Sequence, residues 1–426
     1  MFIASKAAML SRKAPISMRE QIRISRLDYR ERMVAGSAYL SETFQRTTSA
    51  FERQVRPIDG RLAYVTSPHF PGEHRALMFG SNNYLGLAHD PRVKQAAIEA
   101  IQAFGVSLTG SMLLNGGSLP HRALERALAE LKGFEDAILF SSGYLANMSW
   151  VRTLVRPSDG VVYDERGHAS FLEGLKQSDA REKVSFAHNS LNDFERALEV
   201  AKRGAHDVFV FTEGLFSMDG DLPPLPQIVD RCRDASAILA VDDAHGTGVL
   251  GSSGKGIAEH CGLNGGIDIM VGTLSKALGC VGGFICGSAD LVTFLRANAP
   301  PNIFTASLPP AIVAACLKAI EILRSEPQRV AALARNSSHA RALLGERYQL
   351  IAGSGPILPI LFSRRVDVQR LAFELLQEGI FVNCAIYPAV PVNGPRLRVT
   401  ISSEHLPEDI LLLREKLDFL SRRYVE

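Results

Sequence analysis

Residues 268–283 read "DIMVGTLSKALGCVGG" and contain one lysine, Lys276, in a stretch that is otherwise apolar and rich in glycine. A buried strand disfavours a lysine, and a solvated loop is seldom this apolar. Burial lowers the pKa of an amine because desolvation disfavours its charged form, and a neutral amine is a nucleophile toward an aldehyde. Lys276 is therefore a candidate for a Schiff base. A buried lysine paired with a carboxylate explains the pattern equally well. The neighbouring motifs are needed to distinguish these two roles.

The start of this stretch, "DIMVGT" (268–273), is one of several continuous apolar runs of strand length. The others are "DAILFSS" (136–142), "GVVYD" (160–164), "DVFVFTE" (207–213) and "AILAVDD" (237–243). Such runs are typical of a parallel sheet that helices cover on both faces. Because helical patterns separate them, the sequence predicts an α/β fold with a mostly parallel central sheet and right-handed crossovers.

Two of the predicted helices have clear end signals. Residues 89–105 carry Asp90 as N-cap and Gly105 as the stop, and residues 121–133 end at Gly133. The apolar face predicted for the first helix consists of Val93, Ala97, Ile101 and Phe104. The second helix is predicted to bury Leu124, Leu128 and Leu131.

The chain divides into three predicted regions. Residues 1–75 are predicted to form an N-terminal helical arm, because residues 11–33 are rich in arginine and poor in large apolar side chains. Residues 76–308 form the large domain, and residues 309–426 form a smaller α+β domain in which the alternating pattern changes. A mitochondrial transit peptide is the alternative for the arm, and three acidic residues argue against it: Glu20, Asp28 and Glu31.

Composition excludes several classes of protein. The chain has 426 residues, 46% of them hydrophobic, and a formal charge of +2, which predicts a large core and no nucleic-acid partner. No run of about 18 apolar residues is present, so no membrane span is expected. The six cysteines lack CxxC or histidine spacing, which predicts reduced thiols, no metal site and a cytoplasmic location. They are Cys232, Cys261, Cys280, Cys286, Cys316 and Cys384.

Polar residues follow the apolar runs, and the carboxyl ends of strands meet at one edge of an open α/β sheet. "VDDAH" (241–245) supplies Asp242, a carboxylate that can keep a pyridine nitrogen protonated, although it could instead cap the next helix. "FSSGYLAN" (140–147) has the form of a phosphate-binding helix start, although it is also ordinary helix-start chemistry. His168 can stack on a flat ring or be structural. Together with Lys276, these residues describe a site for pyridoxal phosphate (PLP).

The same motifs resemble those of a known family. From "SNNYLGL" (81–87) to "RLRVTISSEH" (396–405), the chain is similar to the α-oxoamine synthases, which are fold-type I PLP enzymes. The resemblance rests on long motifs in the same order, including "TEGLFSMDGDLPPL", "VDDAHGTGVLGSSGKG", "GTLSKALG" and "FTASLPP". It implies a large PLP-binding domain with a mostly parallel sheet and a smaller C-terminal α+β domain.

The resemblance assigns expected roles to individual residues. Lys276 binds the cofactor and moves the substrate Cα proton, Asp242 pairs with the pyridine nitrogen, and His168 stacks on the ring. The resemblance also places His245 and Ser217 near the phenolic oxygen. The phosphate is expected at Ser142, Gly143, Tyr144 and Thr273. Thr305 is expected to reach the phosphate of a neighbouring subunit, which implies a homodimer with shared active sites. Arg398 is expected to bind the amino acid carboxylate, with Asn82 on the substrate side.

The implied reaction is a decarboxylative Claisen-type condensation. An amino acid reacts with an acyl thioester, from acyl-CoA or an acyl carrier protein, and gives an α-amino ketone, CO2 and a free thiol. Segments such as "FTASLPP", "VGGF", "FSSGYLAN" and "VNCAIYPAVP" look most like serine palmitoyltransferase. In contrast, "VDDAHGTGVLG" looks more like 8-amino-7-oxononanoate synthase, and "NNYLGL" is shared with glycine C-acetyltransferase. A secondary-metabolite synthase of the same family is also open. A PLP aminotransferase or lyase is the alternative from another class.

Two positions depart from the family pattern. Met112 stands where many relatives carry an arginine. Ile386 stands where the serine palmitoyltransferases carry another arginine, which helps to hold the substrate carboxylate. In "RLRVT" (396–400), strand alternation places Arg396 and Arg398 on one face. We expect Arg398 to bind the carboxylate and Arg396 to be a solvated charge at the strand end.

Overall fold

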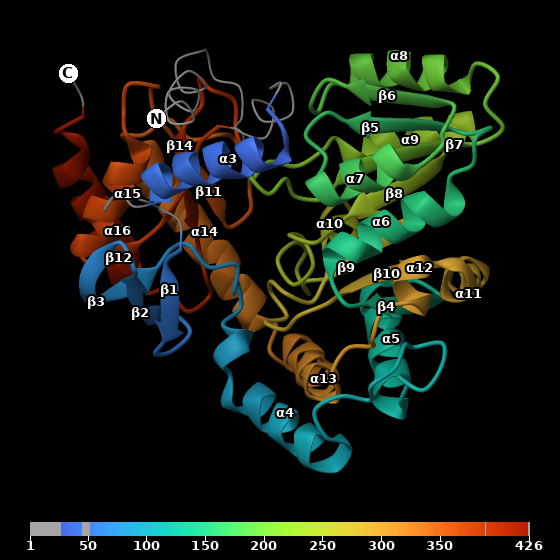
Figure 1. Cartoon of the computed structure of the whole chain (residues 1–426), viewed down its shortest axis with the longest axis horizontal. Coiled ribbons are helices and arrows are strands. Elements are labelled where there is room, and N and C mark those ends of the chain that lie inside the picture. Colours follow the sequence, from blue (N-terminus) through green and yellow to red (C-terminus); the bar gives the residue numbers. More distant parts are fainter. Residues whose placement is uncertain (1–26, 45–51, 388, 425–426) are drawn as a thin grey trace.

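The computed structural model describes residues 27–44, 52–387 and 389–424. Figure 1 shows two parts, a larger one around a central sheet and a smaller one in which segments from both ends of the chain lie together. Residues 1–26 and 45–51, which belong to the predicted N-terminal arm, lie outside the described residues. Among the helices that the structure describes, none is long and apolar enough to cross a membrane.

The large part contains a seven-stranded sheet in the order β4-β10-β9-β8-β7-β5-β6. Its strands are β4 (Asp136–Phe140), β5 (Gly160–Asp164), β6 (Glu182–Phe186), β7 (Val208–Glu213), β8 (Ile238–Asp242), β9 (Ile269–Thr273) and β10 (Gly283–Gly287). Only β10 is antiparallel to its neighbours, so the α/β fold with a mostly parallel sheet is confirmed. The short connection from β9 to β10 contains no crossover helix, which forces the antiparallel pairing.

Helices cover both faces of this sheet because its strands are apolar on both sides. In β4, Leu139 faces one buried cluster while Ile138 and Phe140 face the other. Helices α6 (Gly143–Leu154), α7 (Ala169–Gln177), α11 (Ala289–Asn298) and α12 (Pro300–Ile303) lie on the second side. The first side carries α5 (Leu119–Lys132), α8 (Leu191–Lys202), α9 (Leu225–Ala235) and α13 (Pro310–Ser325). Shorter elements are η1 (Leu87–His89) and α10 (Ile257–His260).

The predicted helix ends are correct, but one predicted apolar face is only half buried. Asp90 caps α4 (Pro91–Phe104) by accepting the Arg92 N–H, and Gly105 ends it. Val93 is buried, whereas Ile101 and Phe104 are 45% and 44% exposed in the single chain. The predicted burial is therefore wrong for the last turn of α4, which extends beyond its contact with α13. In α5 the three predicted leucines are all buried.

The smaller part contains two sheets that combine both ends of the chain. One has the order β1-β2-β3-β12 and the other β11-β14-β13. Their strands are β1 (Gln54–Pro57), β2 (Leu62–Ser67), β3 (Phe70–Met78), β11 (Ile357–Leu361), β12 (Ile380–Phe381), β13 (Asn383–Ala385) and β14 (Arg396–Thr400). Helices α14 (Gln328–Gly345), α15 (Val368–Gln377) and α16 (Pro407–Ser421) accompany them. The α+β expectation for this part is thus confirmed in its secondary structure.

The helical arm predicted for residues 1–75 is wrong over its last third. Residues Tyr29–Phe44 form helix α3, but residues from 54 onward form β1, β2 and β3. The reason is an alternating pattern in β2, where Ala63 and Val65 are buried and their neighbours are more exposed. Because β3 pairs with β12, these strands belong with the C-terminal part of the chain. The domain limits at 75 and 308 stay predictions.

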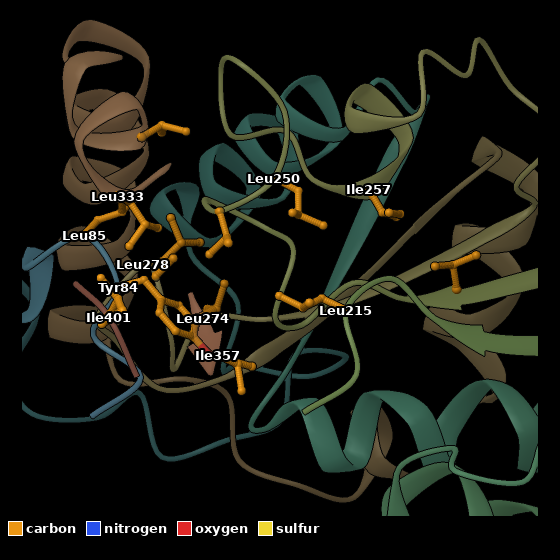
Figure 2. Close-up of a cluster of buried hydrophobic side chains, with 14 of the residues drawn as sticks. Tyr84, Leu85, Leu215, Leu250, Ile257, Leu274, Leu278, Leu333, Ile357 and Ile401 are labelled. Carbon is orange, nitrogen blue, oxygen red and sulfur yellow. The ribbon is translucent and has the colours of Figure 1, made fainter. Parts of the chain in front are cut away.

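An apolar cluster joins the two parts beside the carboxyl edge of the sheet. Figure 2 shows Tyr84, Leu274 and Ile401 pointing toward one another, although they come from three distant segments. Leu274 follows β9 directly, and Ile401 follows β14. The turn that bears Lys276, directly after β9, and strand β14, which bears Arg398, are therefore held together by buried contacts.

Candidate active site

A cavity of about 290 Å³ lies at the carboxyl edge of the seven-stranded sheet. It brings together most of the predicted cofactor residues, from four different segments of the chain. These are Ser142, Gly143, Tyr144, His168, Asp242, His245, Thr273 and Lys276. The cavity is also lined by Asn147, Ser170, Glu213, Ala244 and Ser275. The strand ends therefore meet where the sequence predicted, at the edge where open α/β sheets bind ligands.

Lys276 lies in the turn after β9, where its side chain is half-buried. Burial lowers the pKa of its amine to about 8, against the opposing charges of Asp242 and Glu213. Among the described residues, Lys276 makes no salt bridge. Lys132 is instead the buried lysine that is paired, with Nζ 2.5 Å from Oδ2 of Asp243. The carboxylate-paired alternative therefore fits Lys132, and Lys276 has the setting of a nucleophile.

Asp242 is the last residue of β8 and is buried. Asn147 Nδ2 donates to its Oδ2 at 2.6 Å, and the Ala244 N–H donates to its Oδ1 at 3.0 Å. The helix-cap alternative is wrong, since the next helix, α10, begins only at Ile257. Each carboxylate oxygen has more than one lone pair, so the carboxylate can accept a further proton donor from the cavity.

The N-terminus of α6 forms part of the cavity wall. Ser142 caps the helix, and its Oγ accepts the Leu145 N–H at 3.2 Å. A Cβ at Gly143 would lie 3.1 Å from Cβ of Thr273, and a Cβ at Gly283 would lie 2.5 Å from the Gly143 backbone. Glycine at both positions thus allows β10 and the helix start to approach closely. Gly143 and Tyr144, the first two residues of α6, line the cavity, and the free N–H groups of a helix start favour a bound anion.

Burial favours the neutral form of two histidines in the cavity. His168 caps α7, and burial lowers its pKa, with a further contribution from the charge of Lys276. His245 is buried, and its pKa lies well below the ordinary value because of desolvation and the nearby charges of Lys276 and Arg398. Its Nδ1 lies 2.7 Å from the hydroxyl of Tyr84, whose pKa burial raises to about 12.

Arg398, Asn82 and Ser217 form a second group beside the cavity. The Nε of Arg398 donates to the Ser217 carbonyl oxygen at 2.7 Å, and its Nη1 donates to Asn82 Oδ1 and Thr400 Oγ1, each at 3.2 Å. The Tyr84 hydroxyl also donates to Asn82 Oδ1 at 3.3 Å. This polar chain connects the guanidinium with the buried wall of the cavity. The guanidinium is therefore held in place before any ligand arrives.

The expectation that Arg396 is a solvated charge is wrong. Its side chain is buried and forms an ion pair with Asp219, whose other oxygen accepts from Arg166 at 2.5 Å. Arg396 also donates to the Met218 carbonyl oxygen at 3.2 Å. The prediction that Arg396 and Arg398 lie on one face of the strand is confirmed, since both side chains donate to the loop after β7. Arg396 thus links the smaller part to the loop that carries Ser217.

Thr305 does not line the cavity that contains Lys276. It lines a separate small pocket with Met112 and Ser141. Its loop is joined to the 107–118 loop by the Ser307 N–H, which donates to the Gly110 carbonyl oxygen at 2.9 Å. The adjacent Phe304 is 83% exposed. Within one chain, therefore, Thr305 and Lys276 are not brought together.

Comparisons with known proteins agree with this geometry. Residues 75–417 match the aminotransferase class I and II family. The 8-amino-7-oxononanoate synthase of Fervidobacterium nodosum is 39% identical over 354 residues, 82% of this chain and 89% of the relative. The serine palmitoyltransferase of Sphingobacterium spiritivorum is 39% identical over 344 residues, 80% of this chain and 86% of the relative.

Solved structures give the same result. The serine palmitoyltransferase of Sphingomonas wittichii matches with a TM-score of 0.86 and 32% identity over 94% of this chain and 99% of that one. A serine palmitoyltransferase solved with PLP matches with a TM-score of 0.84 and 31% identity, over 92% and 97% of the two chains. The chain belongs to the α-oxoamine synthases. The synthase has the fold-type I architecture and is a PLP-dependent acyltransferase.

Several residues that line the synthase's cavity were not predicted from the sequence. Asn147 lies one turn after Gly143, so helical spacing could have placed it beside the predicted phosphate turn. Glu213 ends β7 opposite Asp242, and burial raises its pKa well above the usual range. Ser170 and Ser275 lie within two residues of predicted site residues. Their contacts depend on the fold, so no sequence pattern marks them.

Proposed function

We propose that the synthase binds PLP covalently through Lys276 and condenses an amino acid with an acyl thioester, releasing CO2 and a thiol. When bound, PLP acts as an electron sink for the carbanion at the amino acid's Cα. The proposal rests on the cavity itself. The cavity combines Lys276, whose pKa is lowered by burial, with the buried carboxylate of Asp242 and the N-terminus of α6. A Cβ at Gly143 would lie 3.1 Å from Cβ of Thr273, so glycine lets the helix start lie close to the other residue assigned to the phosphate.

Each side chain then has a defined task. Lys276 provides the neutral amine that binds the cofactor's aldehyde and afterwards moves the Cα proton of the substrate. Asp242 would hold a proton on the pyridine nitrogen, His168 would stack on the ring, and His245 and Ser217 would hold the side of the cofactor that carries the phenolic oxygen. The phosphate is assigned to the amides of Gly143 and Tyr144 with Ser142 and Thr273.

The substrate carboxylate is assigned to Arg398. Its guanidinium offers a planar fork that fits a carboxylate, and its orientation is already fixed by Ser217 and Asn82. Ile386 replaces the arginine of the serine palmitoyltransferases, and its side chain packs against the apolar core and cannot bind a carboxylate. This difference affects which amino acid the cavity accepts. We propose that Arg398 is the principal carboxylate ligand in this chain.

Reductive trapping tests the cofactor assignment. The purified protein, incubated with PLP and then borohydride, should carry the cofactor mass on the peptide that contains Lys276. Lys276→Ala protein should lose the trapped adduct and turnover. If the protein cannot be loaded with PLP, or if the label sits on another lysine, the assignment is wrong.

Thiol release tests the reaction class. Mixing the holoenzyme with amino acid and acyl-CoA should release free CoA, whereas an aminotransferase or lyase needs no acyl thioester. A matrix of amino acids against acyl lengths, with acyl carrier protein as an alternative donor, then identifies the substrates. L-serine with palmitoyl-CoA is the pair expected of a serine palmitoyltransferase. The relatives equally support an 8-amino-7-oxononanoate synthase, so that enzyme's substrate pair is the second candidate.

We also infer a homodimer with shared active sites, in the cytoplasm. Support for the dimer comes from Thr305, which lies outside its own chain's cavity, and from exposed apolar side chains on the loops and at the start of α5. These include Val106, Leu114, Leu119 and Phe304. Mixed dimers of Lys276→Ala and Thr305→Ala chains should regain activity, because one site in each carries neither change. A fully active monomer would contradict the dimer. Six free cysteines support a reducing compartment.

A further inference from the structure

We propose that Asn147 and Ser170 are positioning residues that hold Asp242 and His168 as one hydrogen-bonded unit around the bound cofactor. This inference rests on the proposed function, because it concerns the same cavity. Neither residue belongs to the predicted site, and both line the cavity. Their effect is to fix the orientation of two groups that come from different elements, the end of β8 and the start of α7.

The orientation of the Asn147 amide follows from its partners. Asn147 is 1% exposed, and its Nδ2 lies 2.6 Å from Asp242 Oδ2. Its Oδ1 lies 3.4 Å from Nε1 of Trp150. A carboxylate can only accept and an indole N–H can only donate, so the amide has one possible orientation. Asn147 therefore always presents a donor to Asp242.

The second hydrogen of the same amide defines the role of Ser170. Nδ2 also lies 3.0 Å from Ser170 Oγ, so this hydroxyl accepts from Asn147. Its own hydrogen is then free to donate to His168 Nδ1, which lies 2.7 Å away. The Ser170 N–H points to the same Nδ1 at 3.2 Å. Two donors at Nδ1 leave no room for a proton there, so neutral His168 carries its proton on Nε2.

The network is rigid because it is built into the core. Trp150 is fully buried and stacks on Phe171 and Phe211, with ring centroids 5.8 and 6.2 Å apart. Donors run in one direction, from the Trp150 indole to Asn147, and from Asn147 to Asp242 and Ser170. A change at Asp242 or His168 is thus transmitted to the other through three hydrogen bonds, which join Asp242 to Asn147, Asn147 to Ser170 and Ser170 to His168.

Three single variants of the full-length protein test the proposal: Asn147→Ala, Ser170→Ala and Ser149→Ala. Ser149 is the matched control, because it is also buried on α6 but its hydroxyl donates only to the Leu145 carbonyl oxygen, at 2.6 Å. Trp150 is the sole tryptophan of the chain, so its fluorescence reports cofactor binding directly. The readouts are the PLP dissociation constant from Trp150 quenching and the pH midpoint of the bound cofactor's absorbance.

Asn147→Ala should raise the PLP dissociation constant by on the order of 10- to 100-fold and shift the pH midpoint, because it removes a hydrogen bond to a charged group. Ser170→Ala should raise the constant by about fivefold and shift the midpoint less, because the bond that it removes is neutral. The effect of Ser170→Ala should vanish in a His168→Phe background, since it acts through the imidazole. Ser149→Ala should change neither readout.

Two results would overturn the inference. One is wild-type affinity and midpoint in Ser170→Ala, which decides the matter even if Asn147→Ala does not fold. The other is an equal change in Ser149→Ala and Ser170→Ala, which would show only a structural effect of losing a buried hydroxyl. A wild-type protein that binds no PLP would instead contradict the proposed function, so the two failures are distinguishable.

Discussion

Replacing Lys132 by methionine should remove a large part of the protein's stability. Lys132 lies on α5, and its Nζ donates to Asp243 Oδ2 at 2.5 Å, to the Lys255 carbonyl oxygen at 2.5 Å and to Thr247 Oγ1 at 3.2 Å. Both charged side chains of the pair are almost completely buried. The pair anchors the loop from Asp243 to Ile257, and this loop holds His245 against the cavity.

The magnitude follows from the burial of the pair. Removing one partner of a buried ion pair costs about 3–5 kcal/mol, because the remaining charge is left uncompensated. Domains are typically stable by only about 5–15 kcal/mol, so this loss is large. Lys318→Met is the matched control, since its pair with Glu321 is solvent-accessible and is worth about 0–1 kcal/mol.

The loss should also depend on pH, with a definite sign. Burial raises the pKa of Asp243, and the charge of Lys132 partly lowers it again. Without Lys132 the pKa of Asp243 in the folded state rises further above its unfolded value. Between these two values the folded state binds more protons than the unfolded state, so stability is present at low pH and is lost as pH rises. The deficit of Lys132→Met should therefore be smaller at pH 5.5 than at pH 7.5.

The assay is urea unfolding followed by Trp150 fluorescence at these two pH values. The double variant Lys132→Met with Asp243→Asn should lose less than the sum of the single variants, because it leaves no buried charge unpaired. If Lys132→Met is no less stable than Lys318→Met, or if its deficit does not change with pH, the pair does not stabilise the loop as described.

Four further predictions concern the active site. Asp242→Asn should reduce turnover by at least about 10²-fold through loss of the charge that holds the ring proton, and an unchanged rate in steady-state assays would exclude that role. Arg398→Lys should raise the amino acid KM strongly and leave the acyl-thioester KM nearly unchanged. Arg396→Lys should also raise the amino acid KM, but to a smaller extent, because the ion pair of Arg396 with Asp219 fixes the loop that holds Arg398. Equal KM values for the wild type and Arg396→Lys would refute this. The rate at which apo protein binds PLP should rise as pH passes through about 8, where the Lys276 amine loses its proton; a pH-independent rate in stopped-flow mixing would contradict it.

The large part of the fold was predictable because its signals are local. Apolar runs, N-caps and glycine stops depend on neighbouring residues, and they correctly located the strands that end at Asp242 and Thr273. The polar residues after those strands follow from the rule that carboxyl ends meet at one edge. For this reason the sequence alone is enough to place Lys276, Asp242 and the start of α6 at one site.

What could not be predicted depends on partners that are distant in sequence. The pattern around Arg396 does not reveal that Asp219, 177 residues away, neutralises it in the core. Asn147 and Ser170 become site residues only through the packing of α6 against α7. Strands β1, β2 and β3 pair with one another, but the pairing of β3 with β12, through Leu77 and Met78, joins two segments that are distant in sequence, so no local pattern reveals it.

The pairing of β3 with β12 has a consequence for the order in which the chain acquires its structure. Met78 lies opposite Phe381, so about 300 residues must leave the ribosome before this edge is covered. At about 5–20 residues per second, the early strands wait roughly 15–60 s with an open edge. All strands of the seven-stranded sheet emerge within that interval. An exposed edge can pair with another chain, so this nascent segment is where we expect chaperones to act during synthesis.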